Sequence, residues 1–147
     1  MDKAGHLFIG GALGIILVLL THYYLDWFTF TLLDIGMIIV MIYIYSLLAD
    51  IDSKSATVVW TFIPISIIAL IVGYFMNNNI FMIFGISLLS VTFLAAQFFP
   101  HRGFTHSILF GILVSLPWIY FSWHYSVLTF VCYYSHLLAD ELWFKFI

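Results

Sequence analysis

Most of the histidines and several of the carboxylates in this chain lie in a few short stretches. Four of the six histidines and three of the seven acidic residues occupy these stretches, at His6, Asp50, Asp52, His101, His106, His136 and Asp140. Imidazole and carboxylate groups are common ligands of zinc. A bilayer resists burying them, so they are functional candidates wherever a membrane chain contains them. The pattern indicates a site for a divalent metal.

The last stretch pairs His136 with Asp140, four residues later. In a helix this spacing places both side chains on one face. It suits two ligands of one metal, or one ligand and the carboxylate that orients it. A structural hydrogen bond between helices explains the pair equally well.

Asp50 and Asp52 lie near the end of a predicted helix. Two carboxylates this close repel each other unless a cation lies between them or one of them is protonated. A pair of metal ions or the nearby Lys54 could supply that positive charge. A solvated loop is the alternative interpretation.

His101 and His106 flank Arg102 and Gly103 at the start of another predicted helix. Thr105 is expected to be its N-cap. A helix N-terminus together with Arg102 favours an anion such as phosphate. An interfacial loop with two solvated histidines is the alternative.

His6 lies one helical turn before Gly10, which lies one turn before Gly14. Glycines at this spacing form a close-packing face on membrane helices. We therefore expect His6 to point into the helical bundle rather than toward lipid.

Other polar positions receive simpler interpretations. His22 and Asp26 are expected to form a loop pair at the opposite end of the bundle. Asp34 is expected two turns inside a membrane span, where it either bonds a hydroxyl of a neighbouring helix or belongs to a proton path. Cys132 lies one turn from His136 and is expected to line the site without binding metal.

The composition excludes a soluble protein. Of the 147 residues, 65% are hydrophobic and 7% are charged, and the mean hydropathy is +1.16. Soluble domains carry about 25% charged residues, so this chain is expected to be an integral membrane protein. It has neither a basic patch nor a run of charges, so we expect no nucleic-acid partner.

The apolar stretches predict an all-α, polytopic bundle of six transmembrane helices, forming a single membrane-embedded domain over residues 1–147. A crossing helix needs about 20 mostly apolar residues. The predicted spans are 6–25, 28–49, 56–76, 79–99, 104–122 and 125–145. Six crossings bring the candidate ligands to the same side of the membrane, namely His6, Asp50, Asp52, His101, His106, His136 and Asp140.

The positive residues indicate which side that is. Lys3, Lys54, Arg102 and Lys145 are the only lysines and arginines, and six crossings place all four on one side. Lysine and arginine mark the cytoplasmic side. We therefore expect a protein of the cytoplasmic (inner) membrane, with both termini and the site facing the cytoplasm.

The ordered motifs resemble the YdjM-like family of membrane-bound, metal-dependent hydrolases, some of which are LexA-regulated. The similarity rests on Ala4-Gly5-His6-Leu7, Asp50-Ile51-Asp52, His101-Arg102-Gly103-Phe104-Thr105-His106-Ser107 and Ser135-His136-Leu137-Leu138-Ala139-Asp140. This chain departs from the usual family pattern, with Ala49 in place of a proline and Ser53 in place of a histidine. Glu141-Leu142-Trp143 stands where a Thr-Pro usually follows.

The resemblance implies a ligand set. The family is distantly similar to zinc-dependent phospholipase C and P1-type nuclease, which implies a multinuclear zinc site that acts on phosphoesters. The implied metal ligands are His6, Asp50, Asp52, His101, His106, His136 and Asp140. One to three zinc ions, or another divalent metal, are expected.

These observations favour a membrane-bound hydrolase of a lipid or lipid-linked phosphoester. Asp52 is the expected base, and Arg102 the expected clamp for the phosphate. Two alternatives stay open. One is a transporter or channel for protons or divalent metals, and the other is a non-catalytic membrane protein whose metal holds the helices together. The sequence leaves the oligomeric state open.

Overall fold

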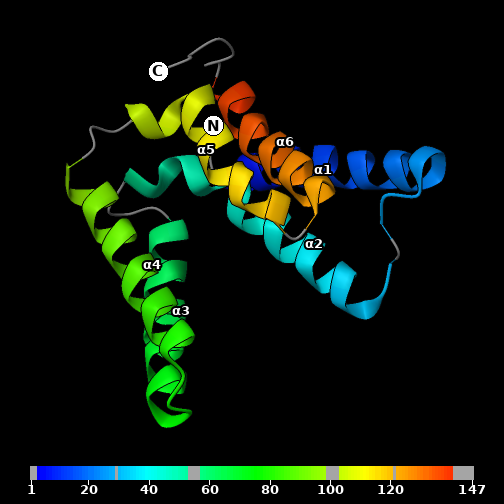
Figure 1. Cartoon of the computed structure of the whole chain (residues 1–147). Coiled ribbons are helices and arrows are strands. Elements are labelled where there is room, and N and C mark those ends of the chain that lie inside the picture. The colour runs from blue at the N-terminus through cyan, green and yellow to red at the C-terminus, as the bar shows by residue number, and fades with distance from the viewer. Residues whose placement is uncertain (1–2, 29, 53–56, 99–102, 121, 141–147) are drawn as a thin grey trace. The chain divides into compact units, whose positions relative to one another are not determined.

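The computed structural model describes residues 3–28, 30–52, 57–98, 103–120 and 122–140. Two compact units make up the chain. The first unit contains residues Met1–Ala49 and Gly103–Ile147, and the second contains Asp50–Arg102. Figure 1 shows the helices of both units, which are described separately below.

Six α-helices and three short 3-10 helices account for the regular structure of the described residues. The first unit has α1 (Lys3–Leu25), α2 (Leu32–Tyr45), η2 (Phe104–His106), α5 (Ile108–Ser115), η3 (Leu116–Tyr120) and α6 (Trp123–Ala139), and the second has α3 (Thr57–Phe75) and α4 (Asn79–Phe98). The helix η1 (Leu48–Asp52) runs across the boundary between the units. The prediction of an all-α fold with six α-helices is confirmed.

The glycines of α1 lie where this helix packs against its neighbours. A Cβ atom on Gly10 would lie 1.9 Å from Ser46 Oγ and 3.0 Å from Ser135 Oγ. A Cβ on Gly14 would lie 2.9 Å from both Cys132 Sγ and Ile42 Cγ1. The predicted close-packing face is therefore confirmed, and it contacts both α2 and α6. His6 lies on the same face and is only 3% exposed.

The start of α2 differs from the prediction. The helix begins at Leu32 because Thr31 is its N-cap and forms a capping box with Asp34. The Asp34 carboxylate also accepts a hydrogen bond of 2.8 Å from the Tyr125 hydroxyl of α6. Asp34 thus lies in the first turn rather than two turns inside a helix. Of the two roles considered, the bond to a neighbouring hydroxyl is the one observed.

The fifth predicted span also differs from the structure. Ser107, rather than Thr105, is the N-cap of α5, and its hydroxyl accepts a bond from Phe110 N at 3.2 Å. The α-helix ends at Ser115, and the chain continues as the 3-10 helix η3, which contains Pro117. Proline lacks the N–H that an α-helix needs and its ring clashes with the carbonyl four residues earlier.

The second unit is a hairpin of two antiparallel helices. Met76–Asn78 connect α3 to α4, and Asn77 adopts a left-handed conformation with φ of 48°, which asparagine tolerates better than most residues. Close to this connection, a Cβ on Gly73 would lie 2.7 Å from Met82 N. A Cβ on Gly85 would lie 2.8 Å from Ser66 O, so the two backbones approach closely.

Helix length separates α1 from α2 and α5. Of the described residues, only the helix Ala4–Leu25 passes the test of length and apolar composition for a membrane crossing. With 14 and 8 residues, α2 and α5 are about 21 and 12 Å long. Both are shorter than the hydrocarbon core, which is about 30 Å thick. Six full membrane spans therefore stay a prediction, as does the single domain.

The α1 packing face gives a test of stability. Gly10→Ala should lower the melting temperature by roughly 3–10 °C, because the added methyl group collides with Ser46 and overpacking costs about 1–3 kcal/mol. The matched control is Gly11→Ala, since a Cβ there meets nothing within 4 Å. This control should melt at the same temperature or slightly higher. Circular dichroism in detergent measures both, and equal destabilisation by the two changes would contradict the packing.

Candidate metal centre

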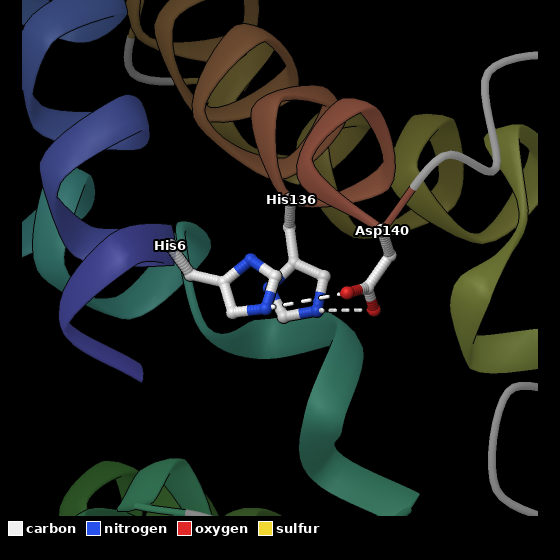
Figure 2. A group of neighbouring side chains, drawn as sticks. All are labelled: His6, His136 and Asp140. Carbon is white, nitrogen blue, oxygen red and sulfur yellow. Dashed lines mark ion pairs between the residues drawn. The ribbon is translucent and has the colours of Figure 1, made fainter. Parts of the chain in front are cut away.

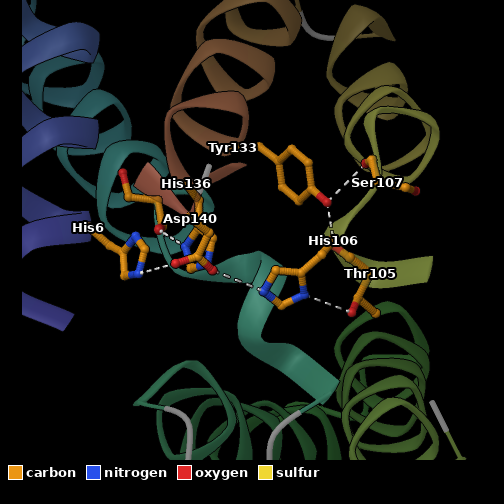
Figure 3. Close-up of polar contacts among 8 residues, drawn as sticks. His6, Thr105, His106, Ser107, Tyr133, His136 and Asp140 are labelled. Atoms are coloured by element: carbon orange, nitrogen blue, oxygen red, sulfur yellow. Dashed lines mark hydrogen bonds and ion pairs between the residues drawn. The ribbon is translucent and has the colours of Figure 1, made fainter. Parts of the chain in front are cut away.

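Three imidazoles and one carboxylate converge within the first unit. His6 comes from α1, His106 from η2, and His136 and Asp140 from the end of α6. Asp140 Oδ1 lies 3.4 Å from His6 Nε2. Asp140 Oδ2 lies 3.7 Å from His106 Nε2 and 3.6 Å from His136 Nε2. Figures 2 and 3 show these nitrogen atoms turned toward the carboxylate.

All four side chains are shielded from solvent. The side chains of His106 and His136 are fully buried, and those of His6 and Asp140 are 4% and 5% exposed. Ionisable groups are rarely this buried unless they are paired or bind a metal. The cluster is therefore a candidate centre for a divalent cation.

The end of α6 positions two of these groups. Asp140 is the C-cap residue, and its backbone N–H donates to His136 O at 3.0 Å. The predicted four-residue pairing of His136 with Asp140 is confirmed by the 3.6 Å approach of their side chains.

A backbone carbonyl determines the tautomer of His136. Its Nδ1 lies 2.8 Å from Ser46 O, and since a carbonyl only accepts, Nδ1 must carry the proton and donate it. In the neutral ring, Nε2 then keeps its lone pair, which faces Asp140. Histidines that bind metals almost always make such a bond through their second nitrogen.

The segment that carries His106 is anchored by a tyrosine. The buried Tyr133 hydroxyl of α6 lies within hydrogen-bonding distance of Thr105 O and 3.1 Å from Ser107 O. The tyrosine ring can approach α5 because position 111 is glycine, where a Cβ would lie 2.4 Å from the ring. These bonds hold the residues on both sides of His106.

Tyr133 was not among the residues predicted for the site. The available signal was a phenol in an apolar helix, one turn before His136. A buried tyrosine hydroxyl usually needs a hydrogen-bond partner.

The ring orientations divide the donors into two groups. His6 and His136 are stacked, with centroids 3.9 Å apart and an angle of 8° between the planes (Figure 2). Imidazole binds a metal in its ring plane, at about 2.0–2.1 Å from nitrogen, so two stacked rings do not share one ion without rotating. His106 lies at 69° to His136, and both rings direct Nε2 to Asp140 Oδ2.

The donor set is one that holds divalent metals. His6, His136 and Asp140 have ligand atoms within 4.8 Å of one another. Ligand atoms of a tetrahedral zinc site with bonds near 2.0–2.1 Å are separated by about 3.3–3.4 Å. The 3.4–3.7 Å separations here are close to that value. His106 reaches the same carboxylate, so these side chains are suitable donors for divalent metal, with one of the stacked rings rotating wherever both bind the same ion. The identity of the metal is left open by this geometry.

The remaining predicted ligands have a different status. His101 and Arg102 lie outside the described residues, as does the Asp52 side chain. Asp50 is the first residue of the second unit. Their roles stay predictions.

Three other polar residues have structural contacts. The Cys132 thiol is buried, with Sγ 3.9 Å from Gly10 O. His22 Nδ1 bonds Phe28 O at 2.7 Å, and His124 stacks on Trp27.

The chain belongs to the YdjM inner membrane protein family, whose model matches residues 1–145. No curated protein and no solved structure matches it. The predicted family is therefore confirmed over almost the whole chain. It is a family of inner membrane proteins, in agreement with the expected cellular location.

The carboxylate gives the first test of the centre. Asp140→Asn should lower zinc affinity by roughly 100-fold or more, because it removes the carboxylate that faces all three imidazoles, and even outer-shell partners are worth about 10- to 100-fold. Asp26→Asn is the control, since Asp26 is exposed and has φ of 52°, which asparagine also adopts. Isothermal titration calorimetry measures both affinities. Equal zinc binding by the two variants would refute the centre.

The tyrosine anchor gives a second test. Tyr133→Phe should weaken metal binding by about tenfold, since it removes the hydroxyl that holds the carbonyls on either side of His106. The helix content should remain, because the ring still packs against Gly111. Tyr24→Phe is the control, at a side chain that is 73% exposed. Competition with a chromophoric chelator measures the affinities, and an unchanged value for Tyr133→Phe would show that the anchor is dispensable.

Proposed function

We propose that this protein is a membrane-bound, metal-dependent hydrolase that cleaves a phosphoester of a lipid or lipid-linked substrate. The observation that carries the proposal is the convergence of His6, His106 and His136 on Asp140. Membership of an inner membrane protein family supports the location.

The depth of the centre supports a lipid substrate. With 23 residues, α1 is about 35 Å long, enough to cross a hydrocarbon core of about 30 Å. His6 is one turn from the start of this helix, and Asp140 caps the end of the antiparallel α6. The centre is therefore expected near the headgroups, where the phosphoesters of lipids lie.

An aromatic group lies at the other end of the same two helices. Trp27 and Trp123 pack with ring centroids 4.2 Å apart, and Trp27 stacks on His124. Tryptophan is enriched at membrane interfaces. With this group at one interface and the metal centre at the other, α1 and α6 together cross the bilayer. The positive residues, among them Lys3 and Arg102, favour the cytoplasm for the side with the centre.

The donor arrangement favours two ions over one. His6 with Asp140 Oδ1 would hold one ion, while His106 and His136 with Oδ2 would hold the other. Asp50, Asp52 and His101 are the proposed additional ligands, on the strength of their motifs alone. A bound zinc would lower the pKa of a coordinated water to about 7 and so supply a nucleophile at neutral pH.

The protein's own groups have separate proposed roles. Ser46 O holds the His136 ring in place through its Nδ1 proton. Burial of the imidazoles keeps bulk water away and strengthens electrostatic interactions at the site. Asp52 would accept a proton from the attacking water, and Arg102 would bind the phosphate and stabilise its developing charge.

A structural metal is the second candidate, because the four groups are buried and come from three separate segments. Structural zinc sites are closed by four protein ligands. This alternative predicts that chelation lowers the melting temperature while no substrate is hydrolysed.

The structure offers less support for a transporter than for a hydrolase. Asp34, the residue considered for a proton path, bonds Tyr125 and Thr31. The hydroxyls of Ser66 and Thr92 in the second unit donate to carbonyls of their own helices.

Hydrolysis tests the proposed function. Full-length protein reconstituted in vesicles of phosphatidylglycerol and phosphatidylethanolamine should release phosphate-containing products when zinc is added. His136→Ala should reduce the rate by at least about 100-fold. His124→Ala is the control and should keep the rate, since this ring belongs to the aromatic group at the far end of α6. Full zinc loading of the wild type without hydrolysis would favour the structural metal instead.

A further inference from the structure

A groove runs between the two helices of the second unit. Its volume is about 250 Å³. The lining residues are Val59, Trp60 and Ile63 from α3, and Leu89, Thr92, Phe93 and Gln97 from α4. All of them belong to the hairpin, so the groove is a feature of this unit by itself.

The walls of this groove are apolar along most of its length. The open end of the hairpin is the end where α3 begins and α4 ends. Thr92 is the polar lining residue farthest from that end, and its hydroxyl donates to Leu88 O at 2.7 Å. The bond to its own helix satisfies the Thr92 proton. The other polar groups, the Gln97 amide and the Trp60 indole, lie near the end of α4 and the start of α3. One end of the groove is thus polar and the rest is hydrocarbon.

The outer surface of this hairpin is also apolar. Residues 57–98 contain no lysine, arginine, aspartate or glutamate. Large apolar side chains are exposed on both helices, among them Ile68, Ile71, Val91 and Leu94. With 19 and 20 residues, the helices are about 28 and 30 Å long, which matches the hydrocarbon thickness of about 30 Å. In an inner membrane protein, such a surface is suited to contact with lipid tails.

The groove has the length of a lipid tail segment in one leaflet. From Leu89 to Gln97 the α4 helix rises about 12 Å, and half of the hydrocarbon core is about 15 Å. The polar end is the end at which the chain enters and leaves the hairpin. The Asp50-Ile51-Asp52 motif lies just before α3 in the sequence, and His101 and Arg102 follow α4.

We propose that the groove between α3 and α4 binds one acyl chain of a membrane phospholipid. The apolar walls receive the chain, while Gln97 and Trp60 lie at the level of its ester groups. The proposal deepens the proposed function and rests on it for the substrate class, because a phospholipid substrate has such an acyl chain. The binding itself does not depend on that function.

Photo-crosslinking tests the binding. Full-length protein is reconstituted in vesicles that contain phosphatidylglycerol with a diazirine on one acyl chain, and the labelled peptides are identified by mass spectrometry. Labels should concentrate on the lining residues of α3 and α4. Leu89→Trp, which fills the groove, should reduce this labelling severalfold. Leu94→Trp is the control, on the same helix at a side chain that is 51% exposed and outside the groove.

The proposal would be overturned if the labels were distributed evenly over all faces of the hairpin and if Leu89→Trp did not change the labelling. A second probe is a photoreactive amino acid in place of Ile63. Lipid adducts would support the proposal, whereas crosslinks to protein would show that a polypeptide covers the groove. Neither readout requires catalysis, so loss of the proposed function leaves this test intact.

Measurements of KM then test whether chain binding in the groove contributes to catalysis. For a long-chain phospholipid, Leu89→Trp should raise KM by roughly tenfold, the effect of losing burial of about two methylene groups. Hydrolysis of a short-chain, water-soluble phosphoester should not change. An equal loss on both substrates would show that the variant acts on the fold rather than on chain binding.

Discussion

The Asp140 carboxylate is the group on which the arrangement of the first unit depends. Burying a charge in this apolar environment costs several kcal/mol unless opposite charges or donors face it. Three imidazoles from three segments face Asp140 at 3.4–3.7 Å. A divalent metal among these groups would supply the positive charge that they lack. The buried charge thus explains both the convergence of the segments and the affinity for metal that we infer.

Close packing around the centre makes that convergence possible. Without side chains at Gly10 and Gly14, α1 approaches α2 and α6 closely enough to bring His6 over His136. Gly111 has the same effect for Tyr133, which anchors the segment of His106. The site is therefore held by backbone contacts and buried hydrogen bonds. Such rigidity favours metal binding, because little order has to be gained when the ion arrives.

The two units divide the work of the proposed enzyme. The first contains the candidate metal centre and α1, which is long and apolar enough to cross the membrane. The second is an uncharged hairpin with an apolar groove. A phospholipid has the same division, with a charged phosphoester at the surface and acyl chains below it.

Several features followed from the sequence because they depend on local spacing. Four residues between His136 and Asp140 place both on one helix face, and a glycine every fourth residue makes α1 a packing surface. The apolar composition indicated the class of protein, and the ordered motifs indicated its family. Helix ends were less predictable. Asp34 looked like a buried charge until the capping box showed that it starts α2.

Only the tertiary structure determined which atoms meet. The Ser46 carbonyl that orients His136 lies 90 residues away from it in the sequence. Tyr133, which anchors the segment of His106, is 28 and 26 residues away from the two carbonyls that it contacts. No local pattern encodes such contacts, since a backbone carbonyl has no residue signature. The stacking of His6 on His136 likewise depends on how α1 and α6 pack. Residue types and spacing therefore identified the candidate ligands, and long-range packing decided how their lone pairs are directed.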